Sequence, residues 1–305
     1  MAEPVAAFDC GSNSTRLLIA SPDGRALARE MHITRLSQGV DATGALSPEA
    51  MERTLSVLRE YRRRCDEAGV ERGLLVATSA VRDASNGALF LDRAREVTRV
   101  ESRVLSGNEE ARFSFAGASA DLAQSALPTM IVDVGGGSTE LASEVEGAML
   151  SYSMQLGCVR VTERALGRDV VTPERDAATR AMIASELERA FDAVPAFDSL
   201  VGKVRLVGLA GTVATLAQLD AHLSVYDRVV VHHRVLSRAT VGSWRDRLAR
   251  EPLDVRLTHP GMVPGREDVL AAGLYVLAAV MDRFEVEELL SSESDILDGI
   301  VFSLL

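Results

Sequence analysis

The chain carries one short motif twice, and this duplication constrains its fold more than any other feature. FDCGSNSTRL covers residues 8–17 and VDVGGGSTEL covers residues 132–141. Counted from Asp9 and Asp133, the two segments share Asp, Gly, Ser, Thr and Leu at the same offsets. The interval between the copies is that of one ordinary domain, so this chain of 305 residues is expected to contain two similar domains.

Apolar patterning around each motif predicts a β-hairpin with the glycine-containing turn at its tip. In both halves the expected order is three strands, helix, strand, helix, strand, helix, and such a domain-sized repeat outweighs any single motif. In the first half we expect strands at 5–9, 15–20, 25–36, 73–80 and 102–106, and helices at 47–69, 86–98 and 108–122. In the second half we expect strands at 129–134, 139–147, 148–156, 203–210 and 286–292, and helices within 158–193 and at 211–219, 237–250, 267–284 and 295–305.

The predicted architecture is two α/β domains facing each other across a cleft, with the paired hairpins at its floor. Pro128 interrupts the helical pattern and places the join near residues 125–130. We expect domain I to comprise residues 1–126, with the C-terminal helix 293–305 packing back on it. Domain II is then residues 127–292.

Composition excludes several classes of protein. The three cysteines are scattered and odd in number, which indicates a reducing compartment. The longest apolar run, residues 269–281, is too short to cross a bilayer, and the N-terminus resembles no signal peptide. We therefore expect a cytoplasmic protein with no membrane partner. The formal net charge of −11 disfavours a nucleic-acid partner, and also a long polyanion lying across the open surface.

The two turns are candidate phosphate sites. Small residues allow successive backbone N–H groups to point into one concavity, and serine and threonine hydroxyls add donors. A single turn of this kind is often only a tight hairpin, but two copies, each following an aspartate, favour phosphate binding. The candidate ligands are Gly11, Ser12, Asn13, Ser14 and Arg16 in the first copy, and Gly136, Gly137, Ser138 and Thr139 in the second.

Two further segments suit an anion. Gly211 and Thr212 stand at a strand-to-helix junction, where a helix N-terminus presents free N–H groups. Such junctions are also common connectors. Arg82 follows the strand at 73–80 and could clamp a phosphate with two N–H groups, or be an ordinary surface arginine.

Carboxylates at the ends of apolar strands point to a metal. An ionised group there is costly unless it is paired or bound to a cation. Asp9, Asp133 and Glu140 are oxygen ligands of the kind that Mg²⁺ takes, so the expected cofactor is Mg²⁺. Glu140 stands where the first copy has Arg16, so one hairpin offers a cation to phosphate and the other a carboxylate that can hold a metal or a water molecule.

Glu109 and Glu110 begin a predicted helix, where acidic residues commonly interact with the helix dipole. That explanation suffices for one of them, whereas a carboxylate facing an anion site could accept a proton from an attacking water. The histidines compete poorly for this role, because VHHR at 231–234 lacks the spacing of a metal site.

Six segments in order resemble the motifs of the exopolyphosphatase/guanosine pentaphosphate phosphatase family. They are DCGSNSTRLLIA, ATSAVRDASN, VLSGNEEARFSFAG, VDVGGGSTEL, VGLAGTVATLAQL and GREDVLAAG, and they span nearly the whole chain. The resemblance implies duplicated ribonuclease-H-like domains of the actin, sugar kinase and Hsp70 superfamily. The short chain, without helical C-terminal domains, is similar to exopolyphosphatases of the actinobacterial type.

The resemblance further implies that Glu110 is the catalytic base and that Asp133 and Glu140 hold Mg²⁺ and position the water. The substrate would be inorganic polyphosphate, with short chains preferred, or guanosine pentaphosphate. Two other interpretations are a kinase of the same superfamily and a non-catalytic sensor of polyphosphate or of an alarmone. The sequence does not decide the oligomeric state, and a homodimer is one possibility.

Overall fold

The computed structural model describes residues 3–305 as two compact units, each built around one mixed β-sheet. The first unit comprises the residues up to Gly117 together with Asp295–Leu305, and the second comprises Ala118–Ser294. The chain therefore passes between the units twice, at 117/118 and at 294/295. By this division the join predicted at 125–130 lies inside the second unit.

The sheet of the first unit has the order β3-β2-β1-β4-β5, in which β1 pairs antiparallel with β2 and parallel with β4. Its strands are β1 Val5–Cys10, β2 Ser14–Ala20, β3 Ala26–Ile33, β4 Arg72–Ala77 and β5 Glu101–Val104. Its helices are α1 Val40–Thr43, α2 Pro48–Glu67, α3 Ser79–Asp83, α4 Gly87–Thr98, α5 Gly107–Ser119 and α13 Ile296–Leu304.

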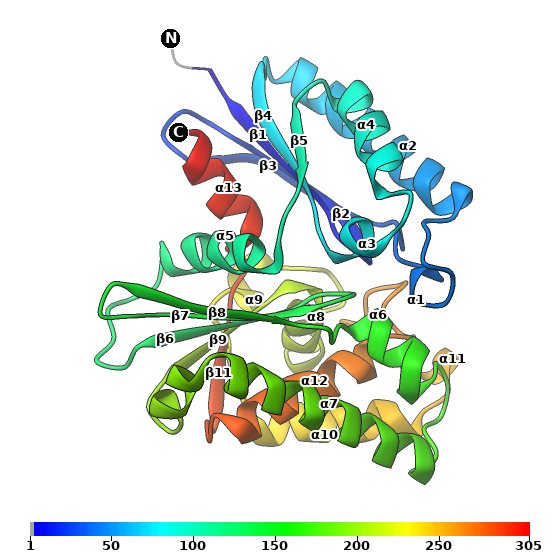
Figure 1. Cartoon of the computed structure of the whole chain (residues 1–305), viewed down its shortest axis with the longest axis vertical. Helices are drawn as coiled ribbons and strands as arrows, with labels where there is room; N and C mark the ends of the chain where they lie inside the picture. The colour runs from blue at the N-terminus through cyan, green and yellow to red at the C-terminus, as the bar shows by residue number, and fades with distance from the viewer. Residues whose placement is uncertain (1–2) are drawn as a thin grey trace. The chain divides into compact units, whose positions relative to one another are not determined.

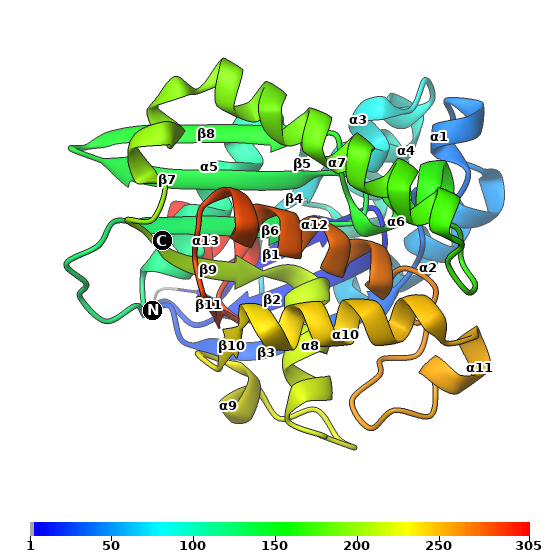
Figure 2. The same cartoon turned by 90° about the horizontal axis from the view of Figure 1, so that it is seen from below.

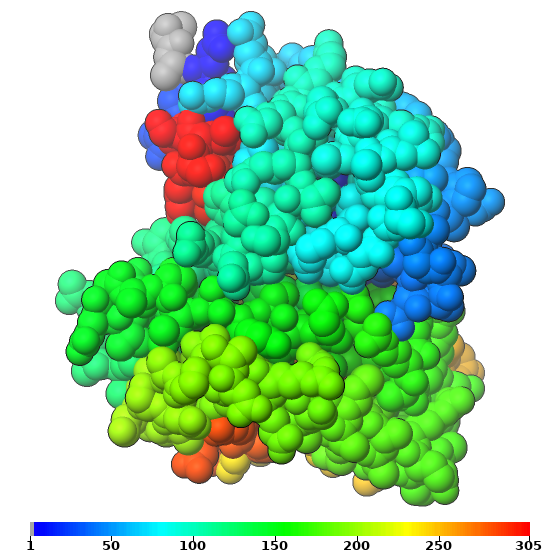
Figure 3. Space-filling model, in the orientation of Figure 1, coloured from blue at the N-terminus to red at the C-terminus, as the bar shows by residue number. Residues whose placement is uncertain are grey.

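Alternating residues of the central strand β1 face two different helix layers. Ala6, Phe8 and Cys10 pack in the cluster formed with α2 and α4, whereas Val5 and Ala7 pack against α13. The C-terminal helix thus returns to the first strands of the chain, and the space-filling view shows its red residues beside the blue N-terminal strands (Figures 1 and 3). Asp9 has the strand parity of Val5 and Ala7, which places it on the α13 face.

Helices α5 and α13 approach each other through two glycines. A Cβ atom on Gly117 would lie 1.8 Å from the carbonyl oxygen of Asp295, and one on Gly299 would lie 2.1 Å from the carbonyl oxygen of Phe113. Both obstacles are backbone atoms, so neither position accepts a side chain without separating the helices.

The sheet of the second unit has the order β10-β11-β9-β6-β7-β8. Its strands are β6 Thr129–Val134, β7 Thr139–Val145, β8 Ala148–Met154, β9 Arg205–Leu209, β10 Val235–Ser237 and β11 Glu288–Ser291. Its helices are α6 Cys158–Val161, a π-helix at Thr162–Leu166, α7 Pro173–Ala193, a 3₁₀-helix at Pro195–Leu200, α8 Ala210–Asp220, α9 Arg228–Val231, α10 Arg238–Arg250, α11 Leu253–Arg256 and α12 Leu270–Arg283.

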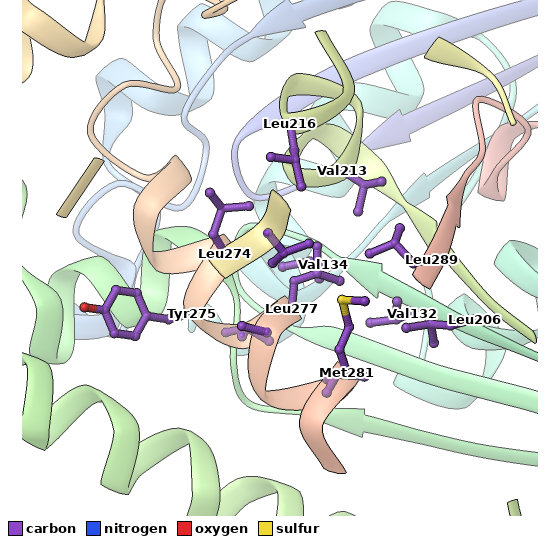
Figure 4. Close-up of a cluster of buried hydrophobic side chains, with 14 of the residues drawn as sticks. Val132, Val134, Leu206, Val213, Leu216, Leu274, Tyr275, Leu277, Met281 and Leu289 are labelled. Carbon is purple, nitrogen blue, oxygen red and sulfur yellow. The ribbon is translucent and has the colours of Figure 1, made fainter. Parts of the chain in front are cut away.

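Helix α12 is the centre of the second core. It lies between α7 and α10 across one face of the sheet, so nearly all its residues are buried (Figure 2). Its apolar side chains belong to one buried cluster with Val132 and Val134 of β6 and Leu289 of β11 (Figure 4). This arrangement explains the apolar run at 269–281 as a buried helix.

The two units repeat one topology, and the predicted α/β fold with duplicated domains is confirmed. Strands β8-β7-β6-β9-β11 follow the order of β3-β2-β1-β4-β5, and β10 is an addition at the edge. The strand predicted at 73–80 ends at Ala77, because the chain turns there into the short helix α3, and β10 was not predicted because it has only three residues. In the part of the chain that the structure describes, no helix is both long and apolar enough to span a membrane.

Candidate active site

Hydrogen bonds to backbone carbonyl groups hold the turn of the first hairpin in place. The Gly11 N–H donates to the Ser14 carbonyl, and the carbonyl of Asn13 accepts from the N–H groups of Thr34 and Arg35. The Ser12 hydroxyl lies 2.9 Å from that of Ser79. Asn13 also has a buried side-chain nitrogen with no hydrogen-bond partner among the described residues, a donor suited to an anionic ligand.

The turn of the second hairpin has the same backbone arrangement, but the donors that hold its carbonyl groups come from α6. The Gly135 N–H donates to the Ser138 carbonyl, as in the first copy. The carbonyls of Gly135 and Gly136 accept from the first turn of α6, and that of Gly137 accepts from Arg160 Nε. Because a Cβ at Gly157 would lie 2.3 Å from the Gly136 backbone, the close packing of α6 on the turn requires glycine there.

Asp9 and Arg16, directly opposite on β1 and β2, form an ion pair. Arg16 donates from Nε and Nη2 to Asp9 Oδ2, at 2.9 and 2.7 Å, and its Nη1 contacts Asp295 at the start of α13. Asp9 Oδ1 is buried and has no hydrogen-bond partner among the described residues. Burial raises the pKa of Asp9, although Arg16 acts in the opposite direction. Burial alone would raise the pKa of Asp295 as well, but the guanidinium groups of Arg16 and Arg29 hold that pKa below its usual range.

Asp133 and Glu140 occupy the equivalent opposed positions on β6 and β7, so the second hairpin presents two carboxylates. Both are buried, at 7% and 1% exposure. Ser153, opposite Glu140 on β8, donates its hydroxyl to Glu140 Oε1 at 2.7 Å. The strand register therefore aligns Asp133, Glu140 and Ser153 in one row across three strands.

The structure distinguishes Glu109 from Glu110. Ser106 and Glu109 form a capping box at the start of α5, since Glu109 Oε2 accepts the Ser106 N–H and the Glu109 N–H donates to Ser106 Oγ. Hydrogen bonds from Ser106 lower the pKa of Glu109 accordingly. Glu110 is buried instead, and its Oε2 lies 3.3 Å from Nη1 of Arg82. The ordinary helix-start explanation therefore belongs to Glu109.

Arg82 is held in place by α5 and the loop before it. Its Nη1 also donates to the Leu105 carbonyl at 2.8 Å. Its Nη2 is buried without a hydrogen-bond partner among the described residues. A buried N–H donor of this kind is costly unless a ligand accepts from it.

Gly211 and Thr212 begin helix α8, as predicted. Ala210 before them has a φ of 65°, a left-handed conformation that turns the end of β9 sharply into the helix. The Thr212 hydroxyl lies 3.3 Å from the Val134 carbonyl, beside the second hairpin. A Cβ on Gly211 would lie 1.8 Å from the guanidinium of Arg266, so this buried arginine sits directly on the glycine.

Sequence reasoning assigned no role to Arg266 or Ser153. Arg266 lies in the segment GREDVLAAG, which was noted only as a motif. Ser153 gives no signal in the sequence, because its relation to Glu140 arises from the register of two strands.

A further group of ionisable residues lies in the second unit. Asp121, His232 and His233 bring ligand atoms within 4.8 Å of one another. His232 Nδ1 accepts the Glu293 N–H at 3.0 Å, so the neutral ring carries its proton on Nε2, which lies 3.1 Å from Asp121. No lone pair of His232 is then left for a metal ion, and the group is better explained as a hydrogen-bonded link.

Each unit thus gathers part of the predicted set. The first brings Arg82 to Glu110 and Arg16 to Asp9, and the second brings Asp133 opposite Glu140, with Thr212 beside the end of β6. The expectation that the two hairpins face one cleft stays a prediction.

Comparison with known proteins identifies the class to which this fold and site belong. The model of the Ppx/GppA phosphatase family matches residues 19–305. Exopolyphosphatase 2 of Mycobacterium tuberculosis is 39% identical over 317 aligned residues, which cover 98% of each chain. The chain therefore belongs to the Ppx/GppA phosphatase family, and the family predicted from the motifs is confirmed.

Other relatives agree with this assignment. A guanosine-5'-triphosphate,3'-diphosphate pyrophosphatase of Photobacterium profundum is 28% identical, over 98% of this chain and 59% of the relative. The crystal structure of an exopolyphosphatase-like protein matches with a TM-score of 0.92 and 34% identity, covering 99% of this chain and 98% of the other. The Ppx/GppA enzyme of Aquifex aeolicus matches with a TM-score of 0.80 and 30% identity, covering 99% of both chains.

Proposed function

We propose that this protein is an exopolyphosphatase that hydrolyses the terminal phosphoanhydride bond of inorganic polyphosphate with the help of Mg²⁺. The observation that carries the proposal is the pair of buried carboxylates, Asp133 and Glu140, directly opposed at the tip of a hairpin with a phosphate-type turn. Family membership and the name of the Mycobacterium tuberculosis relative support the reaction class.

The donor set fits a hard divalent cation. Two carboxylates on the same face of neighbouring strands provide oxygen ligands of the type that such a cation prefers. Mg²⁺ typically takes one or two carboxylates and keeps several waters, so Asp133 and Glu140 would hold it, and Asp9 Oδ1 is a further buried oxygen of the right type. When bound, the ion supplies positive charge to the phosphate oxygens.

Glu110 acts as the general base in this proposal. Its carboxylate accepts a proton from the water whose oxygen attacks the terminal phosphorus. The bond from that phosphorus to the bridging oxygen breaks, orthophosphate forms, and the shortened chain leaves as an anion. Arg82 holds Glu110 on one side and presents its buried Nη2 to a phosphate oxygen.

The remaining candidates bind and orient phosphate. The turn residues at 11–14 and 136–139, the start of α8 at Gly211 and Thr212, and Arg16 supply N–H, hydroxyl and guanidinium donors. Arg16 is already held by Asp9 and Asp295, so its contribution is a fixed charge rather than a mobile clamp. With a net charge of −11, the protein is expected to prefer short polyphosphates.

A second candidate, hydrolysis of guanosine pentaphosphate, is favoured by the Photobacterium profundum relative. The test is Mg²⁺-dependent phosphate release from a polyphosphate length series and from guanosine pentaphosphate, measured side by side on the wild type. Faster release from short polyphosphate supports the proposal. Faster release from the nucleotide would favour the second candidate, and rates that climb steadily with chain length would overturn the short-chain preference.

A further inference from the structure

Ser153 lies at the end of the row of polar side chains that crosses the second sheet. Asp133 on β6 is opposite Glu140 on β7, and Glu140 is opposite Ser153 on the outermost strand β8. Side chains directly opposite in neighbouring strands project from the same face of a sheet. The Ser153 hydroxyl is therefore placed by register at the carboxylate of Glu140.

The contact is a short hydrogen bond to a buried charge. Ser153 Oγ donates to Glu140 Oε1 at 2.7 Å, the usual length for a hydroxyl bonded to oxygen. Glu140 is only 1% exposed, so water cannot readily take over if this donor is removed. A glutamate has three side-chain torsions, and a donor bonded to one oxygen fixes the rotation of the carboxylate and the direction of the other oxygen.

The first hairpin offers a useful contrast. There Arg16 takes the place of Glu140, and the residue opposite it on β3 is Met31, a half-exposed side chain with no hydroxyl. A hydroxyl donor on the third strand is thus present beside the hairpin that carries the Glu140 carboxylate, and not beside the hairpin that carries Arg16.

We propose that Ser153 is a positioning residue for Glu140: its hydroxyl orients the carboxylate that holds the metal ion and the attacking water. This inference rests on the proposed function of Glu140. In this proposal Ser153 acts on Glu140 and not directly on substrate or ion. Its effect is transmitted through one hydrogen bond, so it should alter kcat more than KM.

The test compares Ser153→Ala, Ser153→Thr and Ser143→Ala. Threonine keeps the hydroxyl and suits a strand. Ser143 is a matched control, because it is fully buried on β7 and its hydroxyl has no hydrogen-bond partner among the described residues. Steady-state hydrolysis of short polyphosphate at saturating Mg²⁺ gives kcat and KM, thermal unfolding reports stability, and Mn²⁺ titration followed by electron paramagnetic resonance reports ion binding without substrate.

We expect Ser153→Ala to lower kcat by about 10- to 100-fold, as expected for a lost hydrogen bond to a charged group, with KM changed less than about threefold. Ser153→Thr should restore most of kcat, and Ser143→Ala should match the wild type. The proposal is overturned if Ser153→Ala keeps wild-type kcat, or if threonine fails to rescue it.

If the wild type releases no phosphate from any substrate, the proposed function fails, and Mn²⁺ binding decides the positioning role alone. A dissociation constant for Mn²⁺ raised about threefold or more in Ser153→Ala but not in Ser143→Ala would support that role. Equal affinities would overturn it.

Discussion

Glu140 lies directly opposite Asp133 on adjacent strands, so the second hairpin carries two buried carboxylates where the first carries an ion pair. One turn architecture therefore supports two electrostatic environments. In the first hairpin Arg16 forms an ion pair with Asp9, whereas the second hairpin places two carboxylates opposite each other, a set of oxygen donors that suits a divalent cation.

Mg²⁺ should stabilise the folded protein through this carboxylate pair. Binding to the native state alone adds about 2.7 kcal/mol at a hundredfold excess over the dissociation constant. We expect Mg²⁺ to raise the wild-type Tm and to have little effect on Glu140→Gln. Glu144→Gln, an exposed position on the same strand, is the control and should respond like the wild type. An equal Mg²⁺ shift in Glu140→Gln would argue against this site.

The glycine contact between α5 and α13 should be intolerant of side chains. Gly117→Ala and Gly299→Ala each place a Cβ against backbone, so we expect a loss of about 1–3 kcal/mol in the free energy of unfolding. Urea denaturation measures it. Gly242→Ala is the matched control, because among the described residues a Cβ there would meet no atom within 4 Å apart from its chain neighbours and the nearby backbone of its own helix. Unchanged midpoints in the first two variants would contradict the packing.

Gly211→Ala should cause a local rearrangement of side chains without unfolding the protein. Its Cβ would meet the end of the flexible Arg266 side chain rather than backbone. We therefore expect the Tm to change little while phosphate release falls, because the displaced guanidinium would disturb the proposed phosphate site at Gly211 and Thr212. Loss of activity in Arg266→Gln without loss of stability would likewise indicate that the contact between Arg266 and Gly211 serves activity. Full activity in both variants would contradict this interpretation.

His232 should make stability depend on pH. Burial lowers its pKa below the ordinary value of 6.5, and the neighbouring His233 acts in the same direction. Below about pH 6.5 the unfolded chain takes up a proton that the folded ring resists, so this residue's contribution to stability is lost as the pH falls. In urea denaturation at pH 7.5 and 5.5, His232→Gln should lose less stability on acidification than the wild type. An identical loss would show that His232 is not responsible.

The sequence allowed the elements and the two hairpins to be predicted, because their signals are local. Ser47 caps the helix that was expected to begin with it, and Asp9 and Asp133 each lie one residue before the end of their strands. The two glutamates at 109–110 could not be told apart, because only the fold shows which one caps α5 and which one is buried beside Arg82.

Relations between distant residues escaped prediction for the same reason. Arg16 contacts Asp295 near the other end of the chain, and His232 meets Asp121 from a different part of the second unit. Neither pairing has a local pattern, since each depends on how elements far apart in sequence come together. The assignments of ligands and base to individual residues stay predictions.

The most direct test of the central claim is phosphate release from short polyphosphate by Glu110→Gln and Glu109→Gln, compared with the wild type at saturating Mg²⁺. Glutamine can replace glutamate in the capping box, so Glu109→Gln should fold and keep nearly full activity. Glu110→Gln should fold equally well and lose about 10²- to 10⁴-fold in kcat, because the water loses its proton acceptor. Similar rates for the two variants would contradict the assignment of Glu110 as the base.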